Sequence, residues 1–181
     1  MKWNKRFEYP TSMRSMIGGK RHYDIDAGNK KLPSVTTILS NTQSKEKQES
    51  LSRWRDRVGI NEATRITDTA AARGTAMHNI LELYAGATDL VGVYDGVESI
   101  IDFKQSNKPK RREWIEDYFM QLGAYAMAHN FVYGTNITQG VNLICTKDNL
   151  FQEFIVQGRE FVDYQHKWLA RVDQYYQMRQ E

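Results

Sequence analysis

The sequence predicts one α/β domain that is rich in helix toward its N-terminus. Three observations predict this class. Short runs of alternating apolar and polar residues, which are typical of strands, are separated by turn residues. Longer stretches repeat apolar residues every three or four positions, as amphipathic helices do. The 181 residues are 40% apolar and 26% charged, a balance that suits a folded domain with a hydrophobic core.

The N-terminal third is expected to hold a hairpin and short helices. Residues 21–33 alternate and turn at residues 27–29, which predicts a short hairpin or extended pair. Ser34 and Ser44 each precede a helix-forming stretch. A serine hydroxyl in that position accepts a hydrogen bond from the first turn of the helix, so two short helices are expected after these serines.

From residue 61 on, helix and strand patterns alternate. The helix patterns cover 61–84, 111–130 and 160–180, and the strand patterns cover 88–94, 98–105, 140–146 and 151–158. Asp95 and Gly96 form one of the strongest two-residue hairpin signals, so they are expected to join the first two strands. Within the first helix, Gly74 marks a place where another backbone could approach closely.

The register of that hairpin places two aspartates opposite each other. If Asp95 and Gly96 are the two loop residues, Asp89 pairs directly with Asp102. Cβ atoms in such a pair are ~4.5–5.5 Å apart, and like charges at that spacing are destabilising unless a cation lies between them. Converging carboxylate oxygens favour a hard cation such as Mg²⁺ or Mn²⁺. The hairpin is therefore a candidate metal site.

Lys104 follows Asp102 by two residues, so both side chains share one face of the strand. Its ammonium group could hold an attacking water or stabilise the negative charge of a phosphoryl-transfer transition state. Val91, Val93 and Ile100 lie on the same face by alternation and are expected to half-bury the acids. The alternative is a charge-balanced surface face of an ordinary hairpin.

Two polar residues lie on the helices that flank the hairpin. His78 and Glu82 are four positions apart and share a helix face, without the second histidine of a zinc-protease motif. A lone helical histidine is more often a structural residue than a ligand. Gln121 lies within an otherwise apolar stripe and so needs a hydrogen-bond partner. The residues alone leave a structural and a functional role open for both side chains.

Charge and cysteine content narrow the classes of function. Lysine and arginine exceed the acidic residues by 25 to 22, and four basic residues follow the hairpin directly, Lys108, Lys110, Arg111 and Arg112. That position favours phosphate binding, although a solvated charge run is the alternative. The single Cys145 cannot supply an internal disulfide, a cysteine zinc site or an iron–sulfur cluster. Without a long apolar run or a signal peptide, a cytoplasmic location and no membrane partner are expected.

Four motifs occur in a fixed order: "RGTAMHNILELY", "GATD", "IIDFKQS" and "QLGAY". This order resembles the PD-(D/E)XK nuclease superfamily in its RecB-like form, whose members carry a GxxxH helix, an aspartate, a D-x-K strand and a Q-x-x-x-Y helix. The likeness extends to bacteriophage-type exonucleases and the mitochondrial genome maintenance exonuclease, through "PSVT", "DFKxSxKPK" and a closing helix with tryptophan and tyrosine. It runs from about Pro33 to the end of the chain.

The resemblance implies a restriction-endonuclease-like core, which is a mixed sheet flanked by helices. It implies a metal-dependent DNA exonuclease that acts on single-stranded or free DNA ends in phage-type DNA metabolism or recombination, in the host cytoplasm if phage-encoded. The implied ligands of Mg²⁺ or Mn²⁺ are Asp89, Asp102, the backbone carbonyl of Phe103 and His78. Lys104 is implied to position or activate water, with Gln121 and Tyr125 beside the site. The implied DNA contacts are Ser106, Lys108 and Lys110, with Arg111 of the same basic run.

The chain departs from the family between its first two motifs. His78 and Asp89 are eleven positions apart, whereas the family has a longer stretch there that includes the first strand of the core sheet. A core that lacks or shortens this strand is therefore expected, either as a reduced fold or through an internal deletion near residues 84–85. The expected organisation is one nuclease-like domain over 1–181, with the hairpin and helices of 1–60 before a nuclease core of 61–181.

Two alternatives to an active nuclease stay open. The shortened segment could leave a catalytically inactive remnant that binds DNA or a protein partner. The same acids could also act on another phosphate ester, such as a nucleotide. Against this second alternative, Gly18 and Gly19 lack the spacing of a P-loop, and no other glycine-rich phosphate loop is present.

Overall fold

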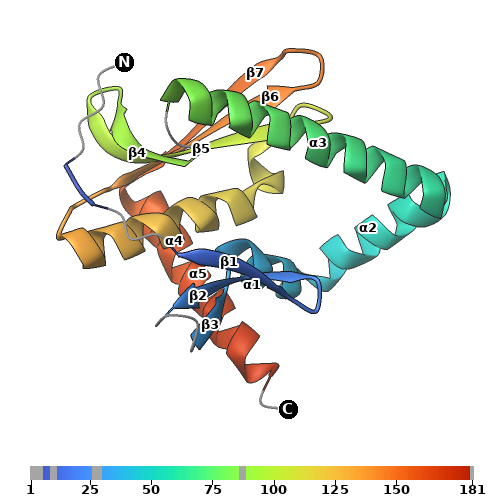
Figure 1. The fold of residues 1–181 in the computed structure, drawn as a ribbon, viewed down its shortest axis with the longest axis horizontal. Helices are drawn as coiled ribbons and strands as arrows, with labels where there is room; N and C mark the ends of the chain where they lie inside the picture. Colours follow the sequence, from blue (N-terminus) through green and yellow to red (C-terminus); the bar gives the residue numbers. More distant parts are fainter. Residues whose placement is uncertain (1–5, 9–11, 26–29, 86–88, 180–181) are drawn as a thin grey trace.

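The computed structural model describes residues 6–8, 12–25, 30–85 and 89–179, of which 25, 81–85 and 89 are described by their backbone alone. Its strands are β1 (Met13–Ile17), β2 (Lys20–Ile25), β3 (Lys30–Pro33), β4 (Asp89–Tyr94), β5 (Val97–Ser106), β6 (Gln139–Thr146) and β7 (Phe151–Gln157). Its helices are α1 (Val35–Asn41), α2 (Lys45–Val58), α3 (Ile60–Ala85), α4 (Glu116–Tyr133) and α5 (Gly158–Gln177), with a 3₁₀ helix at Arg112–Trp114. The elements form two sheets with helices between and around them (Figure 1).

The N-terminal sheet is antiparallel, with the strand order β1-β2-β3. The sequence predicted the β2–β3 pair, but it did not predict β1, because the apolar side chains of this strand remain exposed and its pattern carries no burial signal. β1 and β2 are joined by Gly18 and Gly19, both with positive φ, which glycine adopts without strain. The turn predicted at 27–29 lies outside the described residues.

Both predicted helix caps are confirmed. The Ser34 hydroxyl accepts a hydrogen bond from the Thr37 amide at 3.1 Å, at the start of α1. The Ser44 hydroxyl accepts one from the Lys47 amide at 3.3 Å, at the start of α2. Each cap satisfies a first-turn amide that has no partner within its helix, which explains why the helices begin where the sequence places them.

The second sheet is mixed, with the order β4-β5-β6-β7. β5 and β6 run parallel through the crossover helix α4, and the outer pairs are antiparallel. Asp95 and Gly96 have φ values of 49° and 81°, as the predicted two-residue turn requires. The predicted register is confirmed, because Asp89 pairs with Asp102.

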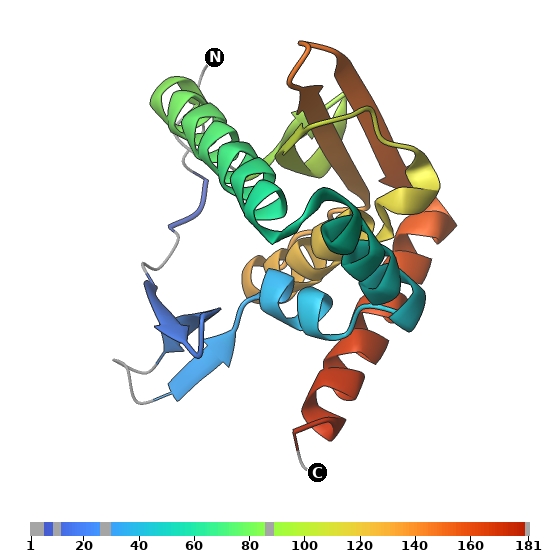
Figure 2. The ribbon, with the colours of Figure 1, turned by 90° about the vertical axis from the view of Figure 1, so that its right-hand side faces the viewer.

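Helices cover both faces of this sheet (Figure 2). On one face, Ile100 and Ile144 pack against Phe119 and Leu122 of α4 and Phe161 of α5. On the other face α3 lies along β5, and several of its side chains line a hollow with Gln105 and Cys145. The prediction of an α/β fold is confirmed, and a mixed sheet flanked by helices fits the restriction-endonuclease-like core that the resemblance implies.

Strand β4 forms one edge of the sheet and is incompletely covered. Val91 and Val93 are exposed, Val93 to 68% of its surface, so the expectation that they half-bury the acids is wrong. The physical reason is that α4 and α5 pack against β5 to β7, where the core residues Ile100, Ile144 and Val156 lie, and β4 lies beyond them. The buried residues of this hairpin therefore lie on β5.

Helix α3 is the longest helix and runs almost directly into β4. It ends at Ala85 and β4 begins at Asp89, so the three residues 86–88, outside the described part, leave no space for another strand between them. A Cβ atom at Gly74 would meet nothing within 4 Å, so the expected close backbone approach there is wrong. Across the described residues, α3 and the other helices fall short of the length and apolar content that a membrane span requires.

Candidate active site

Strand β5 brings Asp102 and Lys104 together on the face that α4 covers. The Lys104 ammonium lies 2.6 Å from Asp102 Oδ2. The Asp102 side chain is 0% exposed and that of Lys104 is 20% exposed. A carboxylate buried to this degree requires a compensating charge, which Lys104 supplies. The burial of Asp102 argues against the alternative of an ordinary charged surface, and the Lys104 side chain remains partly exposed to water.

Helix α4 places the Tyr118 ring near this pair and also carries Gln121 and Tyr125. The Lys104 ammonium lies 5.3 Å from the centre of the Tyr118 ring, within range of a cation–π interaction. The buried Gln121 amide donates a hydrogen bond to the Tyr125 hydroxyl at 3.0 Å, which is the partner that the sequence required for Gln121. Burial, and then the negative charges of Asp102 and Asp117, raise the pKa of Tyr118, so its hydroxyl stays neutral at physiological pH.

His78 reaches the same segment of β5 from α3. Its Nε2 lies 3.0 Å from the backbone oxygen of Phe103, and because a carbonyl can only accept, Nε2 carries the proton in this contact. β4 pairs with β5 only as far as Asp102, so Phe103 is the first residue of β5 beyond that pairing. Asp102, Phe103 and Lys104 are three consecutive residues of β5, and His78 contacts the backbone of the middle one from α3.

Asn142 is a candidate that the sequence did not single out. It lies beside Asp102 in the parallel pairing of β5 and β6, and it is 0% exposed. Neither atom of its carboxamide has a hydrogen-bond partner among the described residues. A buried amide without partners is costly, about 1–3 kcal/mol, so it is uncommon away from functional sites. In the sequence, Asn142 is a single polar residue within an apolar strand. Only the pairing of β5 with β6 shows that it lies beside Asp102.

The donor set suits a hard cation. The Asp102 carboxylate and the Phe103 carbonyl offer oxygen atoms, and the buried Asn142 carboxamide adds a further oxygen beside Asp102. His78 can add an imidazole nitrogen only if that nitrogen no longer donates its proton to the Phe103 carbonyl. Oxygen donors with one imidazole fit Mg²⁺ or Mn²⁺. Asp89 lies opposite Asp102 by backbone register, and its side chain is outside the described part. Among the side chains that are described, no group of three or more His, Cys, Asp or Glu residues could hold a metal ion.

The basic residues that follow β5 differ in their exposure and in the groups that their side chains contact. Lys108 and Arg111 are exposed, and Arg111 stacks over the Trp114 ring at 5.1 Å. Arg112 instead binds Glu160 at 2.7 Å and the Ile155 carbonyl at 2.9 Å, so its guanidinium group is already occupied by contacts within the protein. The exposed members are therefore the ones available to a phosphate.

Ser106 and Lys110 form hydrogen bonds that hold the segment after β5 in place. Ser106 is 4% exposed, and its hydroxyl donates to the Lys108 carbonyl at 2.7 Å. It therefore holds the loop that carries the lysines and does not present its hydroxyl at the surface. The Lys110 backbone exchanges hydrogen bonds with the Gln152 side chain, at 2.6 and 3.0 Å. Burial, and then the Lys47 charge, lower the pKa of Lys110.

Comparisons with known proteins find a relative that matches part of the chain. No family model matches the sequence. A segment of 116 residues, 61% of this chain, is 29% identical to mitochondrial genome maintenance exonuclease 1 of Homo sapiens and covers 33% of that protein. The similarity suggests a relationship to nucleases. The chain spans about a third of the length of this relative. A solved structure described as "Crystal structure of SSO0001" superposes with a TM-score of 0.40 at 13% identity, over 71% of this chain and 70% of that chain.

Proposed function

We propose that this chain is a metal-dependent DNA nuclease of the PD-(D/E)XK superfamily, RecB-like in form, that removes nucleotides from single-stranded or free DNA ends. The observation that carries the proposal is the buried Asp102–Lys104 pair beside the contact of His78 with Phe103. The partial similarity to an exonuclease supports it. A role in phage-type DNA metabolism or recombination is part of the same proposal.

In the proposed hydrolysis of a phosphodiester, the residues of β5 and of the elements packed against it have different roles. Asp89, Asp102, His78 and the Phe103 carbonyl would hold Mg²⁺ or Mn²⁺, which would supply Lewis-acid polarisation of the phosphate. Asp102 holds the Lys104 ammonium in place through their ion pair.

Lys104 then orients the attacking water or donates to the phosphate oxygens as negative charge develops on them. As the resemblance implies, we place the hydrogen-bonded Gln121 and Tyr125 of α4 beside the site. Lys108 and Arg111, both exposed, hold the DNA backbone as it approaches β5.

Removal of the metal tests the proposal directly. Purified protein should degrade end-labelled single-stranded and double-stranded DNA in Mg²⁺ or Mn²⁺ and leave both intact in EDTA, because the charge that polarises the phosphate is then lost. The Asp102→Asn protein, prepared in parallel, controls for a contaminating nuclease. If the folded wild-type protein releases no product in either metal, or cleaves equally well in EDTA, the proposal is wrong.

The short connection between α3 and β4 favours one rival, an inactive DNA-binding remnant. Only residues 86–88 separate the two elements, whereas the family has a core strand in this stretch. A remnant should bind DNA with the salt dependence of phosphate contacts and release no product in any metal. Gel-shift and cleavage measurements on one preparation therefore separate the two functions.

The His78→Ala substitution tests whether α3 belongs to the site despite this connection. We expect the metal concentration for half-maximal cleavage to rise roughly 10–100-fold, as is typical when a metal site loses one of its supporting groups. DNA affinity measured in EDTA should not change. Because His78 also bonds the Phe103 carbonyl, thermal unfolding of the variant is measured as the control for stability. An unchanged metal requirement in a folded variant would mean that His78 only supports β5.

A further inference from the structure

A second polar site lies far from β5, where the N-terminal sheet meets α1. A pocket of about 230 Å³ opens there between β1, β2 and α1, lined among others by Arg14, Met16, Arg21, Thr36 and Ser40. The N-terminal sheet lies on the far side of α4 from the mixed sheet in both views (Figures 1 and 2). The pocket is therefore separate from the candidate active site.

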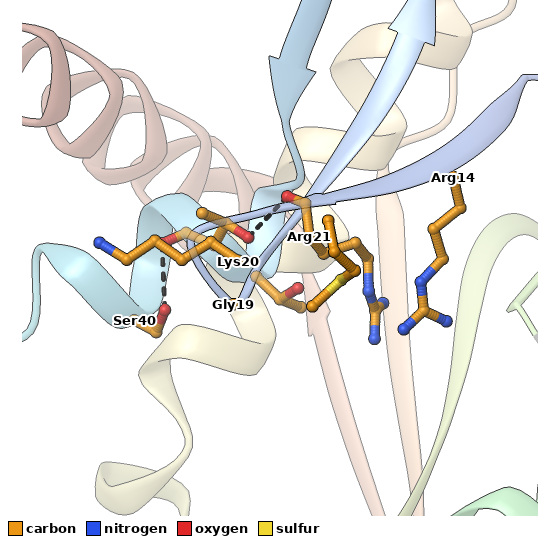
Figure 3. A pocket seen from close by; sticks show the side chains of 8 residues that line it. Arg14, Gly19, Lys20, Arg21 and Ser40 are labelled. Carbon is orange, nitrogen blue, oxygen red and sulfur yellow. Dashed lines mark hydrogen bonds between the residues drawn. The ribbon is translucent and has the colours of Figure 1, made fainter.

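The strand pairing brings two arginines together in this pocket. Met16 pairs with Arg21, and Arg14 precedes Met16 by two residues on the same strand face. Arg14 and Arg21 are thus diagonal neighbours on one face of the hairpin. Both arginines line the pocket, and Figure 3 shows their guanidinium groups pointing the same way, while the Lys20 ammonium points away from them.

Nothing in the described part of the chain neutralises this pair. Neither guanidinium group forms an ion pair with a carboxylate among the described residues. Asp24 lies on the opposite face of the hairpin, where it accepts a hydrogen bond from Ser15 at 2.7 Å and lies 3.5 Å from the Lys31 ammonium. Two neighbouring cations repel each other, and an anion bound between them removes this cost.

The backbone that carries Arg21 is fixed against α1. Its carbonyl accepts hydrogen bonds from the Ser34 amide at 3.1 Å and from the Thr37 hydroxyl at 2.9 Å. The Ser40 hydroxyl donates to the Thr37 carbonyl at 3.0 Å, which orders the helix wall of the pocket (Figure 3). A guanidinium group on a fixed backbone loses less freedom on binding and can contact an anion through two parallel hydrogen bonds.

We propose that the Arg14–Arg21 pocket binds a phosphate group, and that its ligand is a backbone phosphodiester of the same DNA strand that reaches β5. This second step rests on the proposed nuclease function. Paired arginines match the geometry of phosphate oxygens, and the exposed Met16 beside them offers an apolar contact for a sugar. The pocket extends the DNA contact beyond the active site, so only strands long enough to span both places benefit from it.

Length-dependent DNA binding tests this inference. Fluorescence anisotropy in EDTA measures the affinity for labelled single strands of about 30 and about 6 nucleotides, the first longer than a typical single-strand binding site of about 4–16 nucleotides and the second near its lower limit. For the Arg14→Gln/Arg21→Gln protein we expect about 10-fold weaker binding of the long strand and a salt slope smaller by roughly one to two, with the short strand unaffected. Lys30→Gln removes an exposed charge of the same sheet outside the pocket and should change neither affinity.

Unchanged affinity for the long strand, or an equal loss in Lys30→Gln, overturns the inference. If the wild-type protein binds no DNA, the proposed function fails, and the pocket is tested with inorganic phosphate alone. Saturable shifts of the Arg14 and Arg21 Nε–H signals in NMR spectra then identify free phosphate as the ligand, and the absence of shifts overturns the phosphate site as well.

Discussion

The Lys104→Ala protein is expected to cleave DNA roughly 10²–10³-fold more slowly than the wild type, as enzymes do when they lose one preorganised donor to the transition state. The ammonium lies 2.6 Å from Asp102, and the Lys104 side chain is still 20% exposed, so this residue is placed to contact both the acid and the attacking water. The measurement is kcat on end-labelled DNA at saturating Mg²⁺. Lys104→Arg keeps the charge but changes its shape and should restore only part of the rate. A rate within threefold of wild type for Lys104→Ala would contradict the mechanism.

Loss of activity in Lys104→Ala must be distinguished from loss of the fold. Removal of the lysine leaves the Asp102 carboxylate buried without this ion pair, which costs about 3–5 kcal/mol in comparable buried pairs. The Asp102→Asn/Lys104→Ala protein removes both charges and should regain much of that stability in urea unfolding. If the double variant is stable and still inactive, the defect is chemical. A stable and active double variant would exclude both residues from catalysis.

Gly140→Ala is expected to lower stability by about 1–3 kcal/mol, a typical cost of overpacking a core. A Cβ at Gly140 would lie 2.9 Å from Leu122 Cβ and 2.9 Å from the Phe161 ring, both buried and unable to move without shifting α4 or α5. For a chain of this length the unfolding temperature should fall by roughly 2–12 °C. Since Leu122 follows Gln121 on α4, a shift of this helix should also slow cleavage. Circular dichroism melting checks the first effect.

Gly74→Ala is the matched control, because it adds the same methyl group where a Cβ meets nothing within 4 Å. Within α3, alanine is a better helix former than glycine, so the variant should gain about 0.5–1 kcal/mol. Equal melting temperatures for the two alanine variants would contradict the packing of α4 and α5 on β6.

Local rules were sufficient for the predictions that the structure confirms. The Asp95–Gly96 turn sets the pairing of β4 with β5, so the opposition of Asp89 and Asp102 is a matter of counting from a two-residue loop. The caps at Ser34 and Ser44 likewise depend only on contacts within three residues. The α/β class follows from the spacing of apolar residues, because that spacing reports the local geometry of helix and strand.

Packing between distant segments decided the features that the sequence did not reveal. Val93 is exposed and Asp102 is fully buried, although alternation placed both on one face, because α4 and α5 cover β5 and stop short of β4. Asn142 acquires its place beside Asp102 only through the parallel pairing of β5 with β6 across a helix.

The sequence by itself determined which elements form, the register of the central hairpin and the D-x-K spacing, since all of these arise from short-range geometry. Only the tertiary structure decided which charges are buried, that His78 meets the Phe103 carbonyl, and that Arg14 and Arg21 share a pocket against α1. The physical reason is that burial and charge pairing depend on which surfaces exclude water from one another, and that is a property of segments far apart in the chain.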